Sequence, residues 1–370
     1  MNLLSGQEIY QTGSILITLV VLPGIYYFLF IRENKTKVFV ALLAAMIASV
    51  ILHVIVVYTQ LHLGGEVGLS ELWRPFIHIL TLSAQYSNDS GDGIMNILRE
   101  VTFHLFWAGM LLLAVQSRIR TRAYLVFYLI WLVGVAYPVT YNNLGNGLMQ
   151  KLGIAETSGS VHLHFITGFT ALAMVFYTPP VRKFQLSGMV TRWHILFLPF
   201  VLVVSLGAGW VLVSEVSTLP RMAIQIACSF FFFGIFKYFR RRKWKDTEPV
   251  ALMAMNTIVF YGTRDLEGIR VLITAGLTCA GILYVFWVSL NYEDKDPAYF
   301  LWVVHGLGGL VSYLGKPFNS LFENSFTEII SVYGPIMTTY FTAIAATGAY
   351  TFLATYILLG IFNRVVDIKS

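Results

Sequence analysis

The sequence predicts an all-α integral membrane protein, and its composition and the length of its apolar runs are the observations that predict it. Of the 370 residues, 57% are hydrophobic and 12% are charged, whereas a soluble domain carries about 25% charged residues. Most runs have the roughly 20 apolar residues of a spanning helix, well beyond the roughly 10-residue strands of an outer-membrane barrel. We therefore expect a single multi-pass transmembrane domain over residues 1–370, in the plasma or inner membrane of the cell.

Eleven runs qualify as transmembrane helices, and polar residues mark their ends in order. Arg32 and Lys35 separate the first run from the second, the polar stretch 61–97 follows the second as an outer loop, and Arg118 follows the third. The eighth run is the weakest because Arg264 closes it early. The runs cover residues 12–31, 37–60, 98–117, 123–142, 157–178, 193–215, 219–239, 249–264, 270–291, 299–316 and 332–363.

The distribution of positive charge predicts the orientation of these helices. Most lysines and arginines lie in the C-terminal segment and in the loops after the first, third, fifth, seventh and ninth helices. Because positively charged loops stay in the cytoplasm, we expect the N-terminus outside and the C-terminus inside. The densest cluster, Arg-Arg-Arg-Lys-Trp-Lys at 240–245, is interpreted as a topology anchor, with contact to anionic lipid as the alternative. This bias explains the net charge of +6 without a nucleic-acid partner.

The helix count predicts two inverted halves of five helices, at about 12–178 and 193–316, followed by an eleventh helix at 332–363. Inverted repeats place a binding site near the middle of the membrane, between the halves. His164 lies on the fifth helix and His305 on the tenth, which are equivalent positions. Ionisable groups at this depth are rare and mark pathways or cavities. Pseudo-twofold symmetry between the two inverted halves therefore predicts that the two histidines meet near the centre of the protein.

Four motifs, in order along the chain, resemble those of the Amt/Mep/Rh ammonium transporter family. They fall at the end of the first helix, at the junction of the third and fourth, on the fifth and on the tenth. The motifs are Leu22-Pro-Gly-Ile-Tyr-Tyr-Phe-Leu-Phe-Ile-Arg-Glu-Asn-Lys35, Ala114-Val-Gln-Ser-Arg118-Ile-Arg120-Thr-Arg-Ala-Tyr-Leu-Val-Phe127, Glu156-Thr-Ser-Gly159-Ser160-Val-His162-Leu-His164-Phe-Ile-Thr-Gly168 and Asp296-Pro297 followed by Val304-His305-Gly306-Leu-Gly308-Gly309.

The resemblance implies eleven helices in a homotrimer, with one pore per subunit that conducts ammonium or ammonia. It also implies that His164 and His305 are the twin histidines that line this pore. Glu156 falls where the family has an acidic residue that shapes the outer recruitment region. Phe103 aligns with the outer phenylalanine gate, and Ser217 aligns with the serine of the outer ammonium site.

Several positions depart from the family pattern at the outer mouth. Leu144 stands in place of the tryptophan that bacterial transporters carry there, and Val213 replaces the second gate phenylalanine. Phe106 and Trp107, close to the outer gate in sequence, could still offer a cation–π face. Recruitment of the cation is therefore expected to be weaker. Few residues follow the last predicted helix, so we expect the family's regulatory tail to be nearly absent and leave a cytosolic regulator open.

Two further histidines lie near these motifs. His162 is two positions before His164, so on a helix it points away from the face of His164. Packing or a subunit interface is its expected role. His104 follows Phe103 and is expected to face another helix.

A histidine pair suits the chemistry of ammonium. The ion must lose its water to enter an apolar pore, and an unpaired buried ion is very costly. Losing a proton to form neutral ammonia lowers that cost. A neutral imidazole has one donor and one acceptor nitrogen, and its reference pKa is about 6.5. With a water line to carry the proton, transport would be electrogenic; without one, the same pore would be a gas channel.

Other functions remain open at the level of sequence. An Rh-like channel for neutral ammonia or carbon dioxide and a non-conducting ammonium sensor are the main alternatives. A metal site or membrane enzyme would need three or four close donors, and no carboxylate or cysteine is placed to complete a set with the histidines. Cys228 and Cys279 are interpreted as small core residues. We therefore expect no enzymatic activity, no cofactor and no metal.

Overall fold

The computed structural model describes most of the C-terminal two thirds of the chain and parts of the N-terminal third. The described residues are 40–41, 43–45, 47–48, 51, 104, 106–115, 118–119, 121–144, 149, 152, 154, 160–177, 218–245, 247–263, 268–290, 296–323 and 334–366. Every regular element of four or more consecutive residues within these ranges is helical.

Short π-helical segments, labelled η, are built into several of the long helices. In chain order the elements are α6 (Thr121–Trp131), η2 (Leu132–Ala136), α7 (Tyr137–Leu144), η3 (Ser160–Phe165), α9 (Ile166–Tyr177), α11 (Thr218–Phe239), α12 (Thr247–Thr263), α13 (Ile269–Ile282), η4 (Leu283–Ser289), α14 (Pro297–Leu301), η5 (Trp302–Leu307), α15 (Gly308–Glu323) and α17 (Gly334–Val366).

The described helices are those of an integral membrane protein. Within the described residues, those long and apolar enough to cross a bilayer are Ala123–Thr140, Pro220–Phe239, Ile269–Ser289, Pro297–Gly315 and Gly334–Val365. They coincide with the predicted fourth, seventh, ninth, tenth and eleventh helices. Among the shorter apolar helices, Phe106–Val115 and Leu163–Tyr177 lie within the predicted third and fifth helices, and Thr247–Phe260 overlaps the predicted eighth but begins two residues earlier. The first and sixth predicted helices, 12–31 and 193–215, lie outside the described residues, so the count of eleven and the orientation stay predictions.

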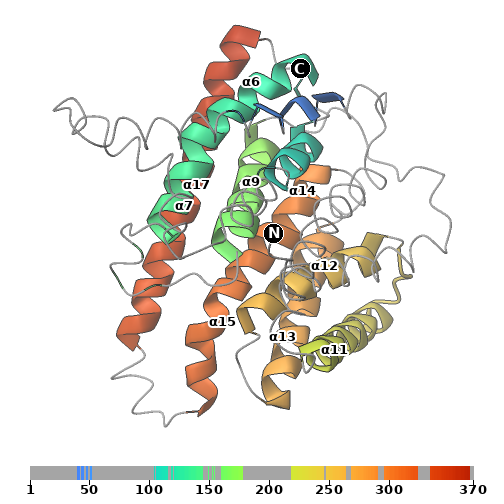
Figure 1. The fold of residues 1–370 in the computed structure, drawn as a ribbon. Coiled ribbons are helices and arrows are strands. Elements are labelled where there is room, and N and C mark those ends of the chain that lie inside the picture. The colour runs from blue at the N-terminus through green and yellow to red at the C-terminus, as the bar shows by residue number, and fades with distance from the viewer. Residues whose placement is uncertain are drawn as a thin grey trace, which may run out of the picture.

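The helix pair that carries both histidines lies inside the helix bundle. α9 packs between α17 on one side and α14 and η5 on the other, while η3 lies against α15. α12 packs on α15, and α11 and α13 pack against each other and against α12. Figure 1 shows this order, with α17 and α7 along one side of the molecule and α11 on the opposite side.

Two glycines let the backbones of these central helices touch. A Cβ atom added to Gly168 of α9 would overlap the backbone of Gly306 in η5. A second such approach joins Gly262 of α12 to Ser312 of α15, where an added Cβ would overlap the serine backbone and side chain. Small residues at membrane helix crossings permit this contact, which gains van der Waals energy where lipid offers no hydrophobic driving force.

Polar side chains tie the outer helices to this centre. Trp131 Nε1 donates to Thr170 Oγ1 over 3.1 Å, and Thr170 Oγ1 lies 3.4 Å from Thr355 Oγ1. The Tyr350 hydroxyl donates to the carbonyl of Gly134 over 2.8 Å. These bonds join α6 and η2, α9 and α17. Hydrogen bonds between membrane helices stabilise by about 0.6 kcal/mol each on average.

Substituting Gly168 with alanine tests the glycine crossing. We expect Gly168→Ala to destabilise the protein by at least about 1–3 kcal/mol, the usual cost of overpacking, because the new methyl group meets backbone rather than a movable side chain. The thermal unfolding midpoint in detergent is the measurement. Gly281→Ala is the matched control, since an added Cβ there meets nothing within 4 Å. Equal midpoints for the two variants would contradict the close approach.

Candidate functional site

The two central histidines lie in direct contact. His164 Nδ1 is 3.0 Å from His305 Nδ1, and the ring centroids are 5.1 Å apart with the planes tilted by 32°. Both side chains are almost fully buried, with 4% and 1% of their surfaces exposed. In a neutral pair, one Nδ1–H donates to the other Nδ1. The donor ring then has an acceptor at Nε2 and the acceptor ring has its hydrogen at Nε2.

Each histidine sits in a π-helical segment. His164 lies in η3 and His305 in η5, and each segment leads directly into an α-helix, α9 or α15. A π-helical turn widens the helix locally, and such turns are frequent at functional sites. Gly306 follows His305 directly, so the glycine contact with Gly168 lies beside the histidine contact. The close approach of the two backbones therefore brings the imidazole rings within hydrogen-bonding distance.

Phe106 is the third ring of this cluster. Its centroid is 5.4 Å from that of His164 with an interplanar angle of 84°, and 5.8 Å from that of His305 with an angle of 64°. It is buried. The sequence grouped Phe106 with the outer gate, but the structure places it against both histidines. A phenyl ring there offers no hydrogen bond and keeps one side of the histidine pair apolar.

Next to this cluster, His104 forms a separate buried polar contact. Its Nε2 lies 2.8 Å from the Tyr137 hydroxyl, and its backbone carbonyl accepts from the Tyr128 hydroxyl over 2.9 Å. Its ring also meets Trp107 edge to face, with centroids 5.7 Å apart. The two tyrosines lie on α6 and α7, so His104 faces neighbouring helices, in agreement with the expectation from the sequence.

A buried ion pair holds the start of the helix that carries His305. Arg118 Nη1 donates to Asp296 Oδ1 over 3.0 Å, and Nη2 pairs with Oδ2. Asp296 Oδ1 also accepts from the backbone N–H of Ala298 over 3.0 Å, so it caps the N-terminus of α14 with Pro297 in the first turn. Arg118 donates back to the carbonyl of Ala114 over 3.0 Å. The bidentate pair therefore links the end of the predicted third helix to the His305 helix.

The sequence placed Arg118 and Asp296 in two different motifs and assigned neither a role. Their side chains are 1% and 2% exposed. A buried arginine or aspartate is expected to be paired, but hydropathy did not show that these two are buried. Nor could it identify one as the partner of the other, because 178 residues separate them.

The structure tests the other predicted site residues only in part. Phe103, Glu156, Val213 and Ser217 lie outside the described residues. The backbone of Leu144 ends α7, and that of His162 lies in η3; their side chains are not among those described. The outer site therefore stays a prediction. Among the described residues, no group of three or more histidine, cysteine, aspartate or glutamate side chains could hold a metal ion.

Comparison with known proteins agrees with the family resemblance seen in the sequence. The family model described as Ammonium Transporter Family matches residues 12–228. A candidate ammonium transporter of Methanothermobacter thermautotrophicus is 23% identical over 367 residues, covering 93% of this chain and 88% of its own length. The ammonium transporter Amt1 of Archaeoglobus fulgidus is 22% identical over 308 residues, covering 77% and 75%.

Solved structures show the same fold. Candida albicans Mep2 superposes with a TM-score of 0.64 and 16% identity, covering 98% of this chain and 85% of that one. Nitrosomonas europaea Rh50 superposes with a TM-score of 0.66 and 13% identity, covering 100% and 91%.

The ion pair at the start of the His305 helix predicts a strong double-mutant coupling. We expect Asp296→Asn to keep the helix cap, because asparagine caps as well as aspartate. It leaves the Arg118 charge buried and unpaired, which costs about 3–5 kcal/mol. Adding Arg118→Met to Asp296→Asn should recover much of this loss. The measurement is thermal unfolding in detergent for the two single variants and the double variant, with the exposed Arg364→Gln as control. Additive losses in the double variant would show that the two side chains are not coupled.

Proposed function

The chain belongs to the ammonium transporter family, and on that premise we propose that it conducts ammonium or ammonia across the membrane past the His164–His305 pair. The observation that carries this proposal is the 3.0 Å contact between the Nδ1 atoms of two buried imidazoles on two crossing helices. Ionisable groups buried in membrane helices usually serve a pathway. Family membership supports ammonium or ammonia as the molecule that this pathway carries.

The proposed step at the histidines is a proton transfer followed by passage of the neutral molecule. Ammonium gives one proton to the acceptor Nε2 of the pair, which breaks an N–H bond in the ion and forms one on the ring. The resulting ammonia can accept from an Nε2–H, since both Nε2 atoms of the pair then carry hydrogen. When the transferred proton leaves the ring, the freed Nε2 can accept from the ammonia. The proton then leaves through water, or returns to ammonia on the far side. The first route moves charge and the second is electrically silent.

Phe106 favours the neutral form of the molecule in this scheme. Its ring lies against both imidazoles and offers them no polar contact. A cation in such surroundings loses hydration that the ring only partly replaces, because cation–π attraction is about 0.5–2 kcal/mol. Neutral ammonia loses much less on leaving water. Apolar walls and a histidine pair therefore together select ammonia over ammonium and over other cations.

At the outer mouth, we propose that Glu156, Phe103 and Ser217 recruit the substrate. The tryptophan of the family's outer site is replaced by Leu144, and the second gate phenylalanine by Val213. These changes weaken cation recruitment and favour a second candidate, an Rh-like channel for neutral ammonia or carbon dioxide. The proposed assembly is a homotrimer in the cell membrane.

Removing one imidazole tests conduction through the pair. We expect His164→Ala, reconstituted in vesicles, to lose ammonium-evoked current on a solid-supported membrane by about 100-fold, the usual scale for losing a positioned proton-transfer group. Phe176→Leu is the control, because Phe176 is on the same helix and is 69% exposed. A current that persists in His164→Ala would refute the role of the pair. If the unmodified protein gives no current, a stopped-flow ammonia pH assay separates a gas channel from a sensor.

Shortening Phe106 tests its part in excluding water. We expect Phe106→Ala to raise water permeability of the vesicles several-fold, because the substitution leaves a cavity beside two polar rings that water can enter. Stopped-flow light scattering after an osmotic step is the measurement. Phe106→Leu retains most of the apolar volume and should behave as the unmodified protein does. Unchanged water permeability in Phe106→Ala would show that the ring does not separate the histidines from water.

A further inference from the structure

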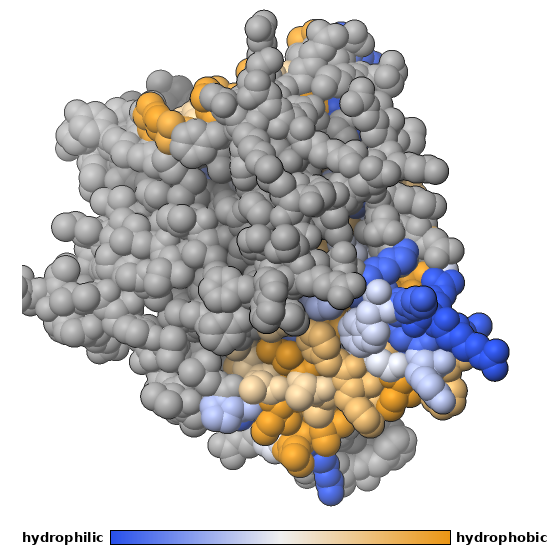
Figure 2. All heavy atoms as spheres, turned by 90° about the vertical axis from the view of Figure 1, so that its right-hand side faces the viewer, coloured by the Kyte–Doolittle hydropathy of each residue, from blue (hydrophilic) through white to orange (hydrophobic). Residues whose placement is uncertain are grey.

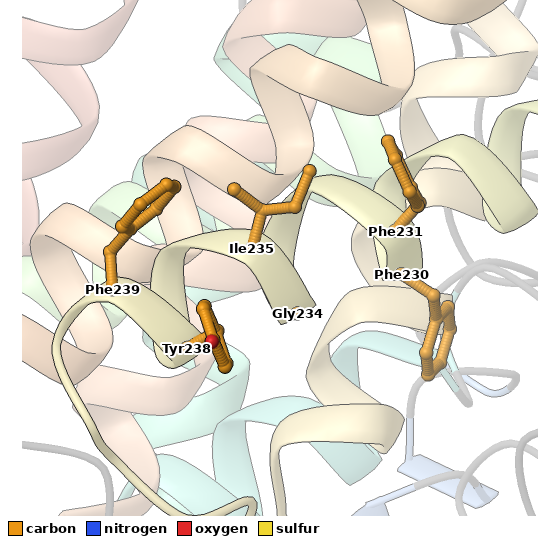
Figure 3. A pocket seen from close by; sticks show the side chains of 6 residues that line it. All are labelled: Phe230, Phe231, Gly234, Ile235, Tyr238 and Phe239. Carbon is orange, nitrogen blue, oxygen red and sulfur yellow. The ribbon is translucent and has the colours of Figure 1, made fainter.

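Two groups of aromatic side chains outside the histidine pair differ in burial. On α11, the rings of Phe231, Tyr238 and Phe239 are exposed. Figure 3 shows them along one helix, and Figure 2 shows an apolar surface on this side of the molecule. Between the predicted third and fourth helices, by contrast, the rings are buried and hydrogen-bonded. Because buried polar groups need partners in a defined geometry, the second group determines how these two helices fit together.

His104 joins the third helix to the fourth through both its side chain and its backbone. Its Nε2 lies 2.8 Å from the Tyr137 hydroxyl, and its carbonyl accepts from the Tyr128 hydroxyl over 2.9 Å. All three side chains are buried. One turn further along the third helix, the Tyr124 hydroxyl donates to the carbonyl of Ala108. Three tyrosines of the fourth helix therefore hold the third helix in one register.

The π-helical segment η2 brings Tyr137 to the side of the fourth helix that carries Tyr128. Tyr137 follows Tyr128 by nine residues, and steps of about 100° would place them about 180° apart on an uninterrupted α-helix. Since η2 lies between them, its wider turn reduces this angle to roughly 90°. The widened turn therefore makes the double contact with His104 possible.

Phe106 lies on the other side of the third helix. It follows His104 by two residues, so the two side chains are about 160° apart around the helix. The phenyl ring contacts both imidazoles of the histidine pair, while His104 contacts the fourth helix. Rotation of the third helix about its own axis would therefore move Phe106 across the imidazoles. The bonds at His104 oppose this rotation, because hydrogen bonds are directional and apolar packing is not.

We propose that His104 is a positioning residue, which fixes the rotation of the third helix and so holds Phe106 against the histidine pair. This role rests on the function proposed above, because it concerns the apolar side of the conduction path. His104 does not touch the transported molecule. It acts through Phe106, so that its loss lets water enter beside the imidazoles.

Fluorine NMR of the full-length protein, with 4-fluorophenylalanine in place of Phe106, tests the position of the ring. We expect the resonance to shift in His104→Leu, because the ring-current field of the imidazoles changes when the phenyl ring moves. Tyr137→Phe removes only a hydroxyl and should shift the resonance in the same direction. His104→Gln keeps a polar group near the position of Nε2 and should restore most of the original resonance. Tyr299→Phe is the control, since it removes a hydroxyl bond from an equally buried tyrosine in another helix pair.

The water permeability of vesicles, measured by stopped-flow light scattering, tests the consequence for conduction. We expect His104→Leu to raise it several-fold, as for Phe106→Ala, because water can enter beside the two polar rings. The double variant should be no more permeable than Phe106→Ala, since His104 acts through Phe106. A histidine that only stabilised the fold would lower the thermal unfolding midpoint and leave the water permeability unchanged.

Three results would overturn the role of His104. The first is an unchanged fluorine resonance or an unchanged water permeability in His104→Leu. The second is an equal fluorine shift in Tyr299→Phe, and the third is a double variant that is more permeable to water than Phe106→Ala. Failure of the proposed function gives a different pattern. The unmodified protein would then carry neither ammonium nor ammonia, while the fluorine resonance would still respond to His104→Leu.

Discussion

The contact on which the rest of the site depends is the backbone approach of Gly168 to Gly306. Any side chain at Gly168 would occupy the space of the opposing backbone, so this crossing distance exists only with glycine. The two histidines lie next to the crossing, and their Nδ1 atoms meet at 3.0 Å. In a membrane, where packing rather than the hydrophobic effect drives helix association, such a contact determines both the stability of the crossing and the geometry of the chemistry beside it.

Two buried ion pairs position the helices around this crossing. Arg118 and Asp296 hold the start of the His305 helix, and the same carboxylate caps that helix. Lys237 and Glu248 join the end of α11 to the start of α12. A buried pair adds little net stability over apolar packing, but breaking it is costly, because it leaves one charge unpaired. These pairs therefore act mainly against misplacement of the helix ends. The position of a helix end in turn sets the depth in the membrane of the groups further along that helix.

Polar groups lie in two different surroundings in this chain, buried at the histidine pair and exposed at the surface of α11. At the centre, Phe106 packs against two imidazoles and makes one side of the pair apolar. A neutral molecule is favoured over an ion in such surroundings. At the end of α11, by contrast, cationic and aromatic side chains are exposed side by side. A buried polar group needs a partner to offset its lost hydration, whereas an exposed charge keeps its hydration.

The sequence by itself determined the membrane class and the approximate positions of the described helices, and it predicted that the two histidines meet. Hydropathy and charge are local properties, and lipid demands long apolar helices whatever their partners. Only the tertiary structure decided the π-helical turns at both histidines, the placement of Phe106 against them and the pairing of Arg118 with Asp296. The pairing of Arg118 with Asp296 joins residues 178 positions apart, and Phe106 meets His305 across an even longer stretch of the chain. Hydropathy carries no signal for a widened turn or for the choice of partner, because both depend on how two helices fit when they cross.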